Sequence, residues 1–177
     1  MKVEKVKMTN ESLLVEKDYD YSDSFKTDFI DKDNKIDIMV VSKAFFSSSP
    51  EWIGKLFTLR NKIVSVFGLK TGGKTKSKKE LLTNFKGQIG EQVGIFKVFD
   101  RSDNEIILGE DDRHLNFRVS LLLKPEKEDE KSLTISTTVN FNNSFGKLYF
   151  LPVKPFHKII VPVMLKSTIK EAVAQSS

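Results

Sequence analysis

A regular alternation of side chains first appears between Tyr19 and Ile30. One set of alternate positions carries Tyr19, Tyr21, Asp23, Phe25 and Thr27, and the other carries Asp20, Ser22, Ser24 and Lys26. Because successive side chains of a strand point to opposite faces, this period of two predicts a strand with one mixed aromatic face.

Helical spacing replaces this alternation after the strand. Apolar residues between Ile36 and Phe45 fall on one helical face, which predicts a short helix. A second helix is predicted from Pro50, because the serines at 47–49 can cap it and proline is favoured at the first helical position. Its apolar stripe runs from Trp52 to Phe67. Two consecutive helices are therefore expected.

The period returns to two in the next part of the chain. Four strands are predicted, at residues 95–99, 105–110, 114–123 and 133–141. Polar turns separate them, which favours an antiparallel meander. In the third strand, Leu115, Phe117 and Val119 alternate with polar residues, so the sheet should have one dry and one polar face.

The C-terminal segment is expected to cover the dry face. Asn143 or Ser144 can cap a short helical turn, and a longer helix with a kink at Pro162 should follow. The residues expected on its apolar side are Phe156, Ile159, Ile160, Val163 and Met164. The pattern predicts an α+β fold in which an antiparallel sheet wraps a long C-terminal helix.

Composition supports a single domain and excludes several kinds of chemistry. The chain has 177 residues, of which 39% are hydrophobic, and it has no cysteine, so disulfides and thiolate catalysis are excluded. Its net charge of +5 comes mainly from lysine, and no nucleic-acid partner is expected. Residues 1–18 are expected to be flexible at their start, 19–171 to form the domain and 172–177 to fray. With no signal peptide or membrane span recognised, a cytoplasmic location is expected.

His114 is one of two histidines that can carry acid–base chemistry. It follows Asp111 and Asp112, and a carboxylate can fix the tautomer of a histidine acting as a general base. The same segment is also a strand turn, so a structural role is favoured. Arg118 is expected to pair with Asp100 or Glu110 on a neighbouring strand.

His157 is the stronger candidate because it lies on the helix that the sheet should hold. It can donate a hydrogen bond to a ligand, although most histidines in such positions are satisfied locally. Tyr149 is the third catalytic candidate. A metal site would need both histidines near Asp20 or Asp23, which the spacing does not indicate, so no metal and no cofactor are expected.

Four local motifs occur in order along the chain. They are Tyr21-Ser22-Asp23-Ser24-Phe25, Pro50-Glu51-Trp52 with Leu59-Arg60-Asn61, Asp112-Arg113-His114-Leu115-Asn116-Phe117-Arg118, and Lys154-Pro155-Phe156-His157. Together they resemble the bacterial family called domain of unknown function 2867, and the order of elements resembles the helix-grip fold of the START-like superfamily. The resemblance covers residues 19–170 but departs at 70–86, a lysine-rich segment interpreted as a variable loop.

The resemblance implies a pocket between the sheet and the last helix, without an established reaction. The leading hypothesis is a noncatalytic module that binds a small hydrophobic or amphipathic molecule. Its expected ligand-binding residues are Trp52, Phe117, Tyr149, Phe156, His157, Ile160 and Met164. A second hypothesis is a cyclase, isomerase or hydrolase that uses a pocket histidine. A third is docking on a dehydrogenase-like partner, because some similar proteins carry this domain after an NAD(P)-binding domain. The oligomeric state stays open.

Overall fold

The computed structural model describes residues 1–14, 18–48 and 82–176. The helices and strands in these ranges are β1 (Glu4–Val6), β2 (Tyr21–Ile30), α1 (Ile38–Ser47), β3 (Gln92–Val93), β4 (Phe96–Arg101), β5 (Glu105–Asp111), β6 (Leu115–Lys127), β7 (Glu130–Phe141) and α4 (Ser144–Ser176). The second predicted helix, with Trp52 and Phe67, lies outside the described residues.

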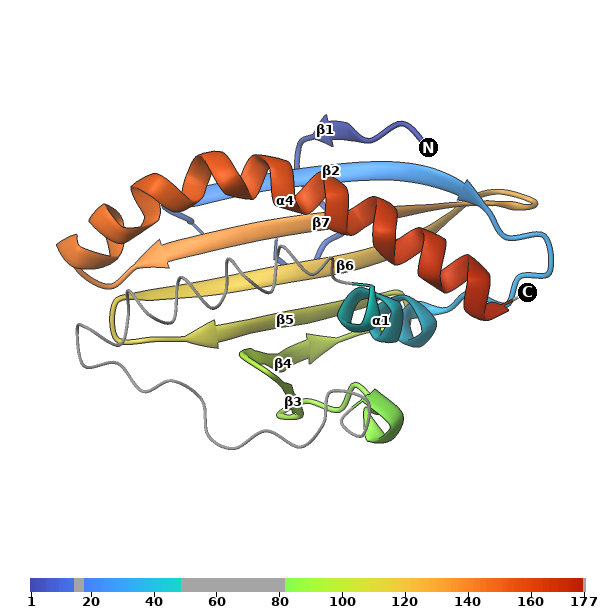
Figure 1. Cartoon of the computed structure of the whole chain (residues 1–177), viewed down its shortest axis with the longest axis horizontal. Helices are drawn as coiled ribbons and strands as arrows, with labels where there is room; N and C mark the ends of the chain where they lie inside the picture. Colours follow the sequence, from blue (N-terminus) through green and yellow to red (C-terminus); the bar gives the residue numbers. More distant parts are fainter. Residues whose placement is uncertain (15–17, 49–81, 177) are drawn as a thin grey trace.

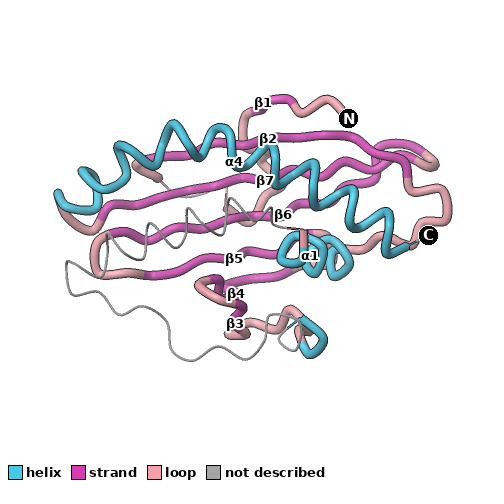
Figure 2. The backbone as a smooth tube through the Cα atoms, viewed as in Figure 1, coloured by secondary structure: helices cyan, strands magenta, loops and turns pink. Residues whose placement is uncertain are grey.

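One antiparallel sheet organises the described part of the chain. Its seven strands follow the order β1-β2-β7-β6-β5-β4-β3, with β2, β7, β6 and β5 making the most extensive pairings (Figure 1). Helices α1 and α4 lie on the same face (Figures 1 and 2). The α+β class, the antiparallel meander and the long C-terminal helix are confirmed, and the arrangement is helix-grip-like. The very short strands β1 and β3 were not predicted.

The dry face of the sheet points toward the helices and forms the core. Val119, Leu121 and Leu123 of β6 pair with Thr137, Ile135 and Leu133 of β7, and every apolar member of this set is buried. The opposite, outer face carries hydroxyl groups, including Ser24, Ser120 and Ser136. The alternation predicted from the sequence therefore separates an apolar inner face from a hydroxyl-rich outer face.

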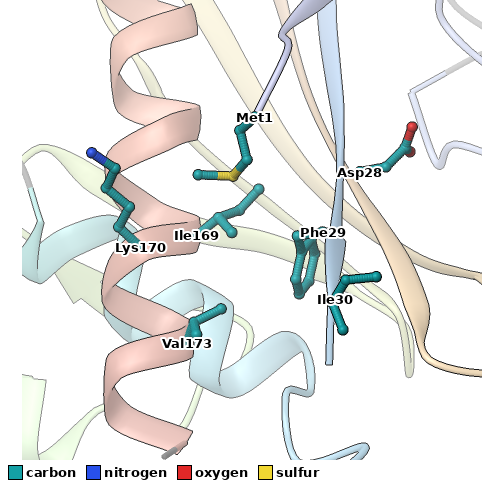
Figure 3. A pocket seen from close by; sticks show the side chains of 7 residues that line it. All are labelled: Met1, Asp28, Phe29, Ile30, Ile169, Lys170 and Val173. Carbon is teal, nitrogen blue, oxygen red and sulfur yellow. The ribbon is translucent and has the colours of Figure 1, made fainter. Parts of the chain in front are cut away.

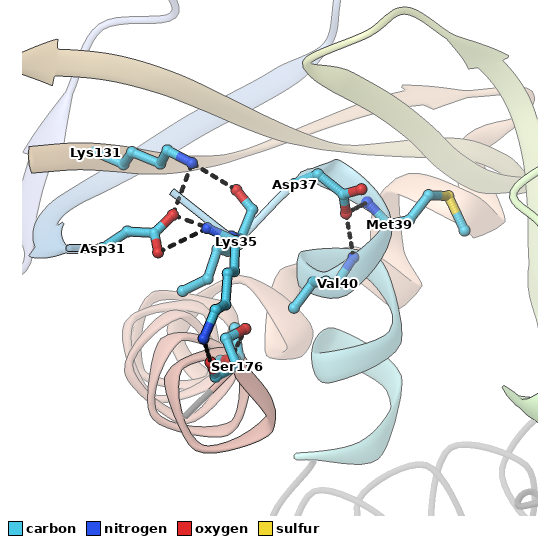
Figure 4. A network of polar contacts seen from close by, with 9 residues as sticks. Asp31, Lys35, Asp37, Met39, Val40, Lys131 and Ser176 are labelled. Atoms are coloured by element: carbon cyan, nitrogen blue, oxygen red, sulfur yellow. Dashed lines mark hydrogen bonds and ion pairs between the residues drawn. The ribbon is translucent and has the colours of Figure 1, made fainter. Parts of the chain in front are cut away.

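A polar network joins the end of β2 to β7 and to the end of α4 (Figure 4). Asp31 is buried and accepts hydrogen bonds from the backbone N–H groups of Lys35 and Ile36 and from the Lys131 ammonium at 2.7 Å. Burial alone would raise the pKa of Asp31, but these donors outweigh it and hold the pKa below its usual value. Lys35 Nζ reaches the backbone oxygen of Ser176, at the end of α4.

Helix α1 begins with a side-chain cap. Asp37 has extended backbone geometry, and its carboxylate accepts hydrogen bonds from the N–H groups of Met39 and Val40 (Figure 4). Val41 and Phe45 are buried, and so is Ser42, whose hydroxyl donates to the Ile38 carbonyl, so this short helix presents a largely apolar side to the core.

Helix α4 differs from the sequence prediction in several ways. It is one helix rather than a short turn and a longer helix, and it contains Pro152 and Pro155 as well as Pro162. It arches over the sheet in Figure 1, as expected for a helix with interior prolines. A frayed tail was expected from residue 172, but α4 continues to Ser176 and Ala172 is buried.

The buried side of α4 also differs from the predicted one. The residues that face the sheet are Gly146, Phe150, Val161, Met164, Leu165, Thr168, Ile169 and Ala172. Phe156 and Ile159, which were expected on this side, are exposed. The reason is the helical period: Val161, Met164, Thr168 and Ala172 follow one another at steps of three and four and share one side of the helix, whereas residues 156 and 159 lie on another side.

The N-terminal segment packs against the sheet instead of extending freely from it. Strand β1 pairs with β2, and Ser12 and Leu14 are buried. The start of this segment was expected to be flexible, but here it adds an edge strand.

Candidate functional site

A cluster of polar side chains lies on the inner face of the sheet beneath the N-terminal half of α4. Tyr21 and Asp23 occupy alternate positions of β2, so both point toward this face, opposite Val139 and Thr137 of β7. His157 belongs to α4 and approaches from above. The three side chains come from segments that are distant in sequence and meet only in the folded chain.

Asp23 is the centre of the cluster. Its Oδ2 atom accepts a hydrogen bond of 2.5 Å from the Tyr21 hydroxyl and lies 3.2 Å from Nδ1 of His157. The Asp23 side chain is only 1% exposed, whereas His157 is partly exposed. A carboxylate only accepts hydrogen bonds, so Nδ1 of His157 carries a proton and donates a hydrogen bond to Asp23.

The second oxygen of Asp23 has no such partner. Asp23 Oδ1 and Thr137 Oγ1 are both buried and make no hydrogen bond to the described part of the chain. The two residues lie directly opposite each other on β2 and β7. Leaving a buried polar group unsatisfied costs about 1–3 kcal/mol, so this pair marks a place where a further polar group would be stabilised.

Aromatic side chains close one side of the cluster. The rings of Tyr21 and Phe150 meet edge to face with centroids 4.9 Å apart, and Phe141 follows 5.5 Å from Phe150. Lys154 Nζ lies 5.4 Å from the centre of the Tyr21 ring. Burial raises the pKa of the Tyr21 phenol above its usual value, and the hydrogen bond to Asp23 and its charge raise it further. Tyr21 therefore stays protonated as a donor.

His114 lies apart from this cluster, at the start of α4. Its Nδ1 atom is within 3.3 Å of Asn143, and its ring packs against Phe145 with centroids 4.6 Å apart. The backbones of His114 and Gly146 also approach each other closely. A Cβ atom on Gly146 would lie 2.0 Å from the His114 carbonyl oxygen, so this position has room only for glycine. These contacts join the β5–β6 turn to α4.

Arg118 pairs differently from the prediction. It forms its ion pair with Asp111 at 2.7 Å, and its contact with Glu110 is to the backbone oxygen. The reason is strand alternation, since Asp111 shares the outer face with Arg118 whereas Glu110 points to the inner face. The guanidinium also lies 3.5 Å from the ring centre of Phe99.

The other expected ligand residues are dispersed. Met164 is buried in the core, Phe117 and Ile160 are partly buried against it, and Tyr149 is half-buried. Phe156 points to the exterior, and Trp52 lies outside the described residues. Tyr21 was not proposed as a site residue, and Asp23 was considered only as a metal ligand. A signal existed in the Tyr-Ser-Asp-Ser-Phe motif, which places a carboxylate on the apolar face of a strand.

A separate pocket lies near the other end of α4 (Figure 3). It has a volume of about 460 Å³ and is lined by Met1, Asp28, Phe29, Ile30, Ile169, Lys170 and Val173. Met1 projects between β2 and α4, beside Ile169. None of the Tyr21, Asp23 and His157 side chains lines this pocket. Among the described residues, no group of three or more histidines and carboxylates is placed to hold a metal ion.

The fold and the cluster define a class of α+β protein in which a long C-terminal helix lies across an antiparallel sheet above a buried carboxylate. A comparison with protein families then gives a closer assignment. The family described as "Protein of unknown function (DUF2867)" matches residues 15–164, and the chain belongs to this family. No curated protein and no solved structure matches the chain.

Proposed function

We propose that this chain is a START-like module that binds a small amphipathic molecule between the sheet and the N-terminal half of α4. The single observation that carries the proposal is the buried Asp23 carboxylate, whose Oδ1 atom, like the neighbouring Thr137 hydroxyl, has no hydrogen-bond partner among the described residues. The order of elements and the helix-grip-like arrangement support the START-like assignment.

The chemistry of the cluster indicates what kind of molecule would bind. Asp23 Oδ1 requires a donor, such as a hydroxyl or an amine, and Thr137 can donate or accept. Apolar rings adjoin these groups, because Phe150 packs on Tyr21 and Phe141 packs on Phe150. A ligand with an apolar body and a hydroxyl or amine end would satisfy both requirements.

Native mass spectrometry of protein purified without detergent tests this proposal. A stoichiometric small-molecule adduct is expected in the parent chain and in the control D103N, because Asp103 lies in the exposed turn between β4 and β5. The adduct should be lost in D23N, and extraction would identify it. Retention of the same adduct by D23N would contradict the proposal.

The geometry also favours a second candidate, an enzyme with His157 as general base. The carboxylate at Nδ1 fixes the ring, and no described residue hydrogen-bonds to Nε2, which is the arrangement that histidine bases use. Such a base would exchange protons α to a carbonyl. Incubating cyclic ketones with the protein in D₂O should then give deuterium incorporation by NMR that H157Q abolishes and H114Q retains.

The cytoplasmic location and a dehydrogenase-like partner stay predictions.

A further inference from the structure

The side of α4 that faces away from the sheet is apolar in its N-terminal half. Leu148, Leu151, Phe156 and Ile159 are 65%, 61%, 53% and 61% exposed. Between them lie the exposed Pro152 and Pro155, so that residues 148, 152, 155 and 159 recur at spacings of four, three and four. Such spacings place these residues along one side of the helix. This side is called the outward stripe, and it consists of Leu148, Leu151, Pro152, Pro155, Phe156 and Ile159.

This half of α4 is therefore apolar on two opposite sides. An 18-residue window of the helix has a mean hydropathy of 1.3, and α4 is long and apolar enough to cross a membrane by length and composition. However, Phe150 and His157 hold its inner side to the sheet through Tyr21 and Asp23. Lying on a membrane surface would use the outward stripe and leave these inner contacts intact, whereas crossing the membrane would break them.

The charges on the helix complement an anionic surface. Lys147, Lys154 and Lys158 are exposed and recur at spacings of seven and four, so they form a row along one flank of the outward stripe. Glu171 is the first acidic residue of α4, far from the stripe. Neighbouring lysines without acidic residues are attracted to anionic lipid headgroups, and apolar side chains beside them can enter the interface.

We propose that the outward stripe docks the protein on the surface of a lipid bilayer that contains anionic lipids. Leu148, Leu151, Phe156 and Ile159 insert at the boundary between headgroups and acyl chains, and the lysine row contacts lipid phosphates. The helix axis lies parallel to the membrane plane, and the sheet stays in water.

Co-sedimentation with vesicles tests the proposal. The protein should bind vesicles of phosphatidylcholine with phosphatidylglycerol and release at high salt, but should bind pure phosphatidylcholine weakly. The double variant F156E/I159E should lose at least about tenfold in binding, because it removes insertion and adds negative charge. The matched control is I89E, since Ile89 is 67% exposed but lies outside α4. K147E/K158E should weaken binding only to the anionic vesicles.

Results of three kinds would overturn the proposal. The first is a negative vesicle assay, in which either the parent chain does not bind anionic vesicles or the parent chain and F156E/I159E bind them equally. Another is a fall in Tm for F156E/I159E, which would assign the stripe to packing within the chain. The third is a parent dimer that F156E/I159E dissociates in light scattering, which would assign the stripe to a second copy. D23N should bind vesicles like the parent chain. A failure of the proposed ligand site can therefore be distinguished from a failure of membrane docking.

Discussion

Two carboxylates, Asp23 and Glu105, are buried on opposite faces of the same sheet. Glu105 is 1% exposed, and both of its oxygens have donors: Oε1 accepts from the hydroxyls of Ser12 at 2.6 Å and Ser120 at 2.5 Å, and Oε2 accepts from the N–H of Leu13 at 2.8 Å. Asp23 uses Oδ2 alone, for Tyr21 and His157.

The difference separates a structural carboxylate from one that is free to bind. Both oxygens of Glu105 accept hydrogen bonds that hold residues 12–14 against the outer face. Neither oxygen is therefore available to accept a hydrogen bond from a ligand. The second oxygen of Asp23 is buried, receives no hydrogen bond from the part of the chain that the structure describes, and lies beneath helix α4. Burial of charge is common to both sites, so hydrogen-bond completeness is the property that distinguishes them.

The largest expected effect is the loss of stability in E105A. Removing this carboxylate leaves the Ser12 and Ser120 hydroxyls and the Leu13 N–H without their hydrogen-bond acceptor. The free energy of unfolding should therefore fall by about 3 kcal/mol. Urea denaturation measures the change, with D103A in an exposed turn as the control. A loss no larger than that of D103A would show that Glu105 does not anchor the N-terminal segment.

Asp31 extends the comparison because it is a second buried carboxylate with donors on both oxygens. Its pKa is lower in the folded chain than usual, so its stabilisation is present above the unfolded-state pKa and is lost as the pH falls through the folded-state value. D31N should cost about 2 kcal/mol at neutral pH and flatten the stability profile below about pH 4. Urea titrations at several pH values measure this. An unchanged acid profile would contradict the assignment.

A smaller effect is expected for Y21F. The substitution removes the hydroxyl that donates to Asp23 but keeps the ring that packs on Phe150, so about 1 kcal/mol of stability should be lost. The control is Y149F, since Tyr149 makes no contact with Asp23 among the interactions described. If Y21F and Y149F had the same unfolding free energy, the Tyr21 donor would not support the carboxylate.

The period-two segments made the central sheet predictable, and the apolar run after Asn143 made its covering helix predictable. The short edge strands gave no such signal, because Glu4–Val6 and Gln92–Val93 contain too few residues to show a period. The hydrogen-bond partners of Asp23 and Glu105 also lay beyond sequence reasoning. Asp23 and His157 are 134 residues apart, and Ser12 and Glu105 are 93 apart, so no local spacing connects them. Their partners are selected by strand register and by the position of α4.

The smallest stability effect is expected for D23N, and it sharpens the comparison most. The amide keeps one oxygen to accept from Tyr21, removes a buried charge and replaces the unpartnered oxygen by a donor facing Thr137, so the free energy of unfolding should change by less than about 0.5 kcal/mol. Urea denaturation beside E105A measures this contrast. A fall as large as that of E105A would make Asp23 a structural carboxylate like Glu105. Near-parent stability together with loss of the small-molecule adduct would instead identify the unpartnered oxygen as the binding group, because the fold would be intact while this acceptor is lost.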